Sequence, residues 1–135
     1  MTNNKLMVGN LVSYNGNPIK VENIYGDYIN YSPDIPYVQE ETYIKQEELE
    51  PIPITPEILE KNGFEHNQKE TELMQDIFGD NIMLFNFPLG NGFYIEWNSE
   101  KNVGRITDHC FIKFKYVHEL QHVLKMCGII REIII

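Results

Sequence analysis

Residues 51–56 have the sequence Pro51-Ile52-Pro53-Ile54-Thr55-Pro56, and this stretch divides the chain into two parts. Each proline fixes its own φ angle, favours an extended residue before it and removes a hydrogen-bond donor. Three prolines within six residues therefore predict a stiff, extended junction. We expect one subdomain over residues 1–53 and a second subdomain over residues 54–135.

On the N-terminal side of this junction, the sequence indicates short antiparallel strands. Asn15-Gly16 is a strong hairpin signal, because a type I′ turn needs positive φ at both central residues. Gly26-Asp27 marks a second tight turn. The expected strands are residues 6–14, 19–25, 28–31 and 38–44, with a short fifth strand at 49–54. This spacing predicts a small SH3-like antiparallel β-barrel, which reduces exposed strand edges by curling.

On the C-terminal side, helices and strands are mixed. Thr55 as a cap, Pro56 in the first helical position and Glu57 at the positive helix end predict a helix that stops at Asn62-Gly63. The other expected elements are a helix at 71–78, strands at 82–87, 93–97, 103–107 and 110–114, an amphipathic helix at 116–127 and a closing strand at 129–135. The whole chain is therefore predicted to be α+β.

The last expected helix contains His118-Glu119-Leu120-Gln121-His122, which has the pattern H-E-x-x-H. Residues four apart share one face of a helix, so His118 and His122 are candidate zinc ligands. Glu119 is then the candidate catalytic residue, as general base toward a metal-bound water. This pattern favours a zinc-dependent hydrolase as one alternative function.

Two features of the same helix argue against a metal site. The extended zinc pattern requires glycine at position 125 and histidine at position 128, where this chain has Lys125 and Gly128. At 100° per residue, the apolar positions form one arc, and the opposite arc is polar. The polar arc consists of His118, Gln121, His122 and Lys125. We therefore expect these side chains to face solvent or a partner, with no bound metal and no cofactor.

The charge balance restricts the class of partner. The chain of 135 residues has 11 Lys and Arg against 20 Asp and Glu, which gives a net charge of −9. Such a balance disfavours binding to nucleic acid phosphates or to an anionic membrane. Two cysteines are too few for a disulfide framework, and no apolar run has the length of a membrane span. We expect a reduced, cytoplasmic protein that has no nucleic acid or membrane partner.

Acidic and aromatic residues in the N-terminal part are the candidates for partner binding. Five acids lie within residues 40–50, and six of the eight tyrosines lie between Tyr14 and Tyr43. The acids predict docking of a basic partner or mimicry of nucleic acid, but a solvated strand edge and loop explain them as well. The tyrosines predict a peptide groove, but ordinary packing between strands explains them as well. The candidate residues are Tyr28, Tyr31, Tyr37, Glu40, Glu41, Glu47 and Glu48.

Three stretches of the chain resemble a group of small uncharacterised proteins from phages, prophages and mobile elements of Bacteroides-type gut bacteria. They are Val8–Val12, Leu49–Phe64 and Lys115–Gln121. The resemblance implies no activity. We therefore expect an accessory, non-enzymatic protein-interaction module, with the zinc hydrolase and an acidic inhibitor that mimics nucleic acid as alternatives. Assembly into a homo-oligomer stays open.

Overall fold

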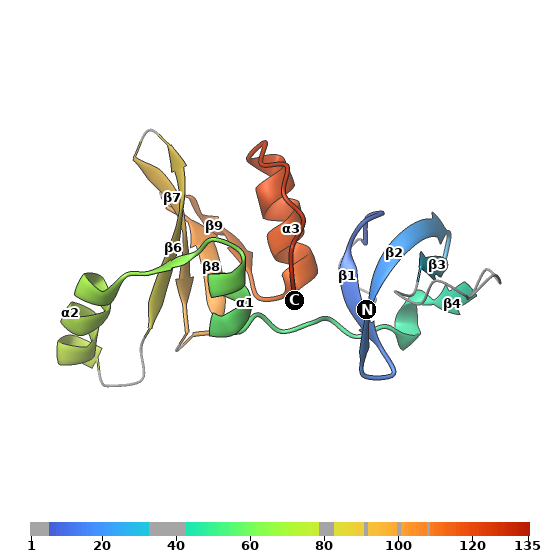
Figure 1. Cartoon of the computed structure of the whole chain (residues 1–135), viewed down its shortest axis with the longest axis horizontal. Helices are drawn as coiled ribbons and strands as arrows, with labels where there is room; N and C mark the ends of the chain where they lie inside the picture. Colours follow the sequence, from blue (N-terminus) through green and yellow to red (C-terminus); the bar gives the residue numbers. More distant parts are fainter. Residues whose placement is uncertain (1–5, 33–42, 79–82, 91, 100, 108) are drawn as a thin grey trace. The chain divides into compact units, whose positions relative to one another are not determined.

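The computed structural model describes residues 6–32, 43–78, 83–90, 92–99, 101–107 and 109–135 (Figure 1). The chain forms two compact units, Met1–Pro53 with Tyr116–Gln121, and Ile54–Lys115 with His122–Ile135. The first unit contains a sheet of strand order β1-β2-β3-β4, and the second contains a sheet of order β5-β6-β7-β8-β9. Both sheets are antiparallel, which confirms the predicted α+β class.

Tight turns join the first strands of the first sheet. These strands are β1 (Leu11–Tyr14), β2 (Asn17–Tyr25), β3 (Tyr28–Ser32) and β4 (Tyr43–Lys45). Asn15 and Gly16 between β1 and β2 have φ angles of 51° and 79°, so the predicted type I′ hairpin is confirmed. Between β2 and β3, Gly26 has a φ of 58°, whereas Asp27 does not have positive φ, which fits a type II′ turn.

The segment after β4 differs from the expected fifth strand. It begins with a 3₁₀ helix, η1 (Gln46–Glu48), and continues without a regular strand. Single antiparallel bridges join Ser13 to Glu50 and Pro53 to Tyr116. The prediction of a strand at 49–54 is therefore wrong, because Pro51 and Pro53 remove the donors that a continuous ladder needs.

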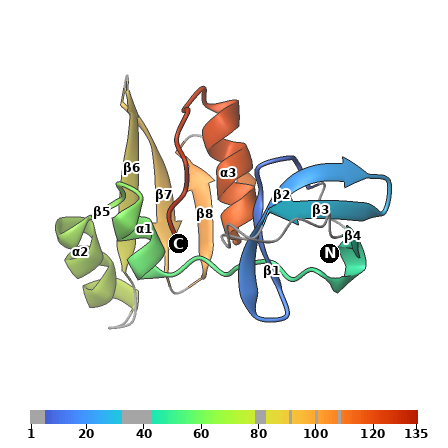
Figure 2. The ribbon, with the colours of Figure 1, turned by 45° about the vertical axis from the view of Figure 1, so that its right-hand side comes forward.

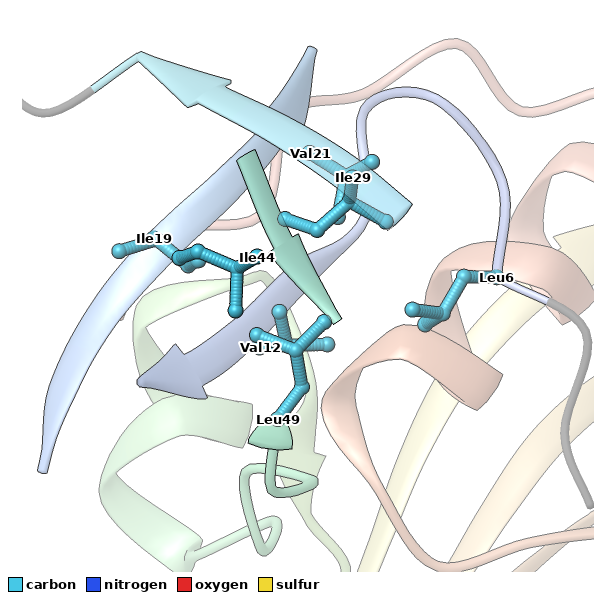
Figure 3. Close-up of a cluster of buried hydrophobic side chains, with 7 residues drawn as sticks. All are labelled: Leu6, Val12, Ile19, Val21, Ile29, Ile44 and Leu49. Atoms are coloured by element: carbon cyan, nitrogen blue, oxygen red, sulfur yellow. The ribbon is translucent and has the colours of Figure 1, made fainter. Parts of the chain in front are cut away.

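The core of the first unit lies on one face of its sheet (Figure 3). It contains Leu6, Val12, Ile19, Val21, Ile29, Ile44 and Leu49, all buried. Val12 is paired with Ile19 across β1 and β2, and Ile29 is paired with Ile44 across β3 and β4. Alternation of buried and exposed residues along each strand places these apolar side chains together.

In its described residues, the second unit contains a five-stranded sheet, two helices that precede or join its strands, and the end of a third helix that starts in the first unit. Figure 2 shows β6, β7 and β8 of this sheet side by side. The helices are α1 (Pro56–Lys61) and α2 (Gln68–Phe78), and the strands are β5 (Glu65–His66), β6 (Leu84–Gly90), β7 (Phe93–Asn98), β8 (Val103–Ile106) and β9 (His109–Phe114). The Thr55 hydroxyl accepts a hydrogen bond from the Ile58 N–H, as predicted for the cap of α1. Trp97, Phe85 and Phe114 are the largest fully buried side chains.

The C-terminal part contains α3 (Val117–Met126) and then an irregular tail. Residues 129–135 form no strand, so the predicted closing strand is wrong. The buried Asn62 amide binds the tail instead: its Oδ1 accepts the Ile134 N–H and its Nδ2 donates to the Ile134 carbonyl, each at 2.7 Å. One side chain thus replaces the neighbouring strand, and Ile133 is the buried isoleucine of the tail.

Candidate functional site

The two regions of interest are the H-E-x-x-H segment at the start of α3 and the tyrosines of the first sheet. In the first of these, Glu119 has a structural role. Glu119 is the third residue of α3, and its Oε1 accepts a hydrogen bond from the backbone N–H of Tyr116 at 3.1 Å. This is the carboxylate half of a capping box, which satisfies a donor that the helix itself leaves unpaired. The group that the zinc pattern assigns to general base catalysis therefore stabilises the N-terminus of the helix.

His118 is fully buried, with 0% of its surface exposed. Its ring stacks on Tyr116, with centroids 6.2 Å apart and an interplanar angle of 8°. The prediction that the polar arc of this helix faces solvent or a partner is therefore wrong at His118. The start of this helix, Tyr116–Gln121, belongs to the first compact unit, and the apolar arc alone does not predict its surroundings there.

Gln121 connects α3 to the strand β1 within the first unit. Its Oε1 accepts a hydrogen bond from the Leu11 N–H at 2.8 Å, and its Nε2 donates to the Gly9 carbonyl at 3.0 Å. The side-chain amide therefore pairs with a donor and an acceptor at the edge of the sheet, as a neighbouring strand does. Sequence reasoning placed Gln121 on the polar arc and missed this contact, which spans 110 residues.

Metal-binding groups do not gather around this helix in the described part of the chain. The residues there form no group of three or more His, Cys, Asp and Glu side chains that is able to hold a metal ion. His122 is half-buried, and the side chains of His109 and Cys110 lie outside the described residues. At the end of the helix, burial raises the pKa of the Cys127 thiol, which favours the neutral thiol over the thiolate that binds metals.

Among the described residues of the first unit, Tyr25, Tyr28 and Tyr43 form an exposed aromatic group. These side chains are 54%, 44% and 53% exposed. Tyr25 is paired with Tyr28 across the β2–β3 turn, and Tyr43 is paired with Asn30 on β3. All three tyrosines therefore lie on the outer face of the sheet, opposite the core. The rings of Tyr25 and Tyr43 are in contact, with centroids 5.8 Å apart. We call these three residues the tyrosine face.

Tyr14 and Tyr31 lie on the other face of the same sheet. Both are partly buried against the core, and their ring centroids are 6.3 Å apart. Tyr31 is paired with Val21, a core residue, and a register shift between Val21 and Asn23 lies between this pair and the tyrosine face. Tyr31 therefore packs with the core and does not join Tyr28, although the sequence suggested that they share one groove. Figure 2 shows β2, which carries Tyr25, side by side with β3, which carries Tyr28 and Tyr31.

The acidic residues of η1 lie beside the β2–β3 turn. The Gln46 N–H donates to the Asp27 carbonyl and the Gln46 Nε2 donates to the Gly26 carbonyl, each at 2.8 Å. These bonds hold Glu47 and Glu48, both exposed, close to the exposed Asp27. Tyr37, Glu40 and Glu41 lie outside the described residues. Strand alternation identifies Tyr25 and Tyr43 as outward-facing, but the position of Asp27 beside η1 follows only from the fold.

No protein-family model, curated protein or solved structure matches this chain. None of the described helices has the length and apolar character that crossing a membrane requires.

Proposed function

We propose that this protein is a non-enzymatic protein-interaction module and that its binding surface is the tyrosine face. The observation that carries the proposal is the exposure of three neighbouring tyrosines on the outer face of one small sheet. Tyrosine is enriched at protein interfaces because its ring offers a large, rigid apolar area and its hydroxyl finds a polar partner. The apolar surface of such an aromatic cluster is more favourable when a partner segment buries it than when it is exposed to water.

The form of the first unit agrees with this role. The strand order β1-β2-β3-β4, the 3₁₀ helix after β4 and the bridge from Ser13 to Glu50 support an SH3-like barrel. Small barrels of this kind bind peptides through aromatic side chains on their surface. The resemblance of three stretches to mobile-element proteins supports an accessory role in a host cytoplasm.

The segment His118–Gln121 supports a non-enzymatic role because its members have structural tasks. Glu119 accepts the Tyr116 N–H, and Gln121 binds the backbone of β1. His118 is buried against Tyr116, so its ring is not presented to a substrate. A hydrolase that used these groups would have to release them from the contacts that hold the helix.

Selection from a random linear peptide library, followed by affinity measurement on the full chain, tests the proposal. The variant Tyr25→Ala/Tyr43→Ala removes two rings of the tyrosine face. The control Leu73→Ala/Ile77→Ala removes two exposed apolar side chains from α2 in the second unit. Circular dichroism establishes that both variants fold.

We expect the tyrosine variant to lose about thirtyfold or more in affinity for the selected peptides, since two buried aromatic anchors contribute more than about 1 kcal/mol each. The control should keep the affinity of the original chain. If no peptide is enriched, or if the selected peptides bind the tyrosine variant as tightly as the original, the proposal is wrong.

A further inference from the structure

The end of the tyrosine face at the β2–β3 turn combines two kinds of group. Tyr25 and Tyr28 flank the turn as a directly opposed pair and present exposed rings. Gln46 holds η1 to the same turn through two hydrogen bonds, which brings the exposed Glu47 and Glu48 close to Asp27. Exposed tyrosines and exposed acidic residues therefore belong to the same turn and to the 3₁₀ helix that is hydrogen-bonded to it.

From this juxtaposition we infer that the partner segment is basic and that it contributes arginine side chains to this end of the tyrosine face. The inference rests on the proposed function and names the chemistry of its partner. A guanidinium group stacks on an aromatic face and at the same time donates paired hydrogen bonds to a carboxylate. Lysine forms the ion pair but lacks the planar surface, so arginine matches the combination better.

The charge of the unit is complementary to such a partner. Within residues 6–32 and 43–53, five acidic side chains stand against two lysines, and the whole chain has a net charge of −9. Lys45 is paired with Tyr28, so it borders the tyrosine face, but the acids of η1 and Asp27 outnumber it at this end. Long-range attraction therefore steers a basic segment toward the site, and this attraction weakens as salt rises.

The test uses a fluorescent synthetic peptide in which three arginines are separated by Gly-Ser pairs. A second peptide has citrulline in place of each arginine, which keeps the planar shape and removes the charge, and a third has lysine. Fluorescence anisotropy measures the affinity of each peptide for the full chain. The site variant is Glu47→Gln/Glu48→Gln, and the matched control is Glu57→Gln/Glu60→Gln on α1, where both glutamates are also exposed.

The two double variants change the net charge equally, so they separate a local site from general attraction. We expect the arginine peptide to lose about fivefold or more in affinity for the site variant and for Tyr25→Ala, and to change less than about twofold for the control. The citrulline peptide should bind at least about tenfold more weakly than the arginine peptide, and the lysine peptide should lie between them.

Equal losses in the site variant and the control would overturn the inference, since the affinity then reports only the net charge. Equal binding of the citrulline peptide would overturn it as well. The proposed function has a separate outcome. If library peptides without basic residues bind through Tyr25 and Tyr43, the interaction module stands and the basic partner is wrong. If no peptide responds to the tyrosine substitutions, both are wrong.

Discussion

Replacement of Gln121 by methionine tests whether the H-E-x-x-H segment is structural. Methionine keeps the length of the side chain and its helix propensity, but it removes both hydrogen bonds to β1. The Leu11 N–H and the Gly9 carbonyl then lose their partner on the helix. Gln121→Met therefore isolates the hydrogen-bond contribution from the packing of α3.

The size of the effect follows from these two bonds. Each intramolecular hydrogen bond contributes a net amount of about 0.5–1.5 kcal/mol to the free energy of unfolding. Gln121 is half-buried, so water replaces part of what is lost. We therefore expect Gln121→Met to lower the free energy of unfolding by about 1–2 kcal/mol. Gln68→Met, at an exposed position of α2, is the matched control and should stay within about 0.5 kcal/mol.

Two measurements check this prediction. Urea denaturation followed by circular dichroism gives the free energy of unfolding, and hydrogen exchange of the Leu11 amide reports the local contact.

A second variant, Gln121→Glu, tests the two hydrogen bonds separately. At neutral pH the carboxylate still accepts the Leu11 N–H but has no donor for the Gly9 carbonyl. The deficit should shrink as the pH falls toward the ordinary glutamic acid pKa of about 4.3, since a protonated carboxyl regains a donor. An unchanged stability together with unchanged exchange at Leu11 would refute the structural role of Gln121.

Three further predictions concern the framework of the two sheets. Gly104→Ala should lower the free energy of unfolding by about 1–3 kcal/mol, because a Cβ there would lie 2.1 Å from the Phe114 ring. Adding Phe114→Leu should recover part of this loss, and an unchanged urea midpoint for Gly104→Ala would contradict the packing. Asn62→Leu should cost about 2–3 kcal/mol and expose residues 129–135 to proteolysis, since the tail loses its paired bonds; an equally protected Ile134 amide would count against it. Gly16→Val should cost about 1–3 kcal/mol by urea denaturation, because φ is 79°, whereas Gly16→Asn should be tolerated; equal midpoints for the two variants would rule out strain in the turn.

Local chemistry was the most predictable part of this fold. The Asn15-Gly16 hairpin and the Thr55 cap depend on neighbouring residues alone, and the structure confirms both of them. The start of α2 was placed three residues late. Asn67 directly precedes α2, and its carbonyl accepts the Thr71 N–H. A polar residue before the apolar pattern therefore marks the start of this helix.

The candidate site was only partly predictable. Tyr28, Glu47 and Glu48 are exposed and stay candidates for partner binding, whereas Tyr31 packs with the core. Tyr28 and Tyr31 are three residues apart on β3, so strand alternation places them on opposite faces of the sheet. The register shift between Val21 and Asn23 affects β2 instead: Val21 and Ile24 both lie on the core side although they are three residues apart.

By itself, the sequence determined the α+β class, the Asn15-Gly16 hairpin and the start of α1, because turn angles and helix capping act over a few residues. Only the tertiary structure decided what covers each element. His118 is buried and Gln121 binds β1 because segments 110 residues apart meet in the first unit. The isoleucine tail forms no strand because the Asn62 amide satisfies its backbone. Such contacts depend on which distant segments meet in the fold. Neither the helical periodicity of α3 nor the composition of the tail gives this information.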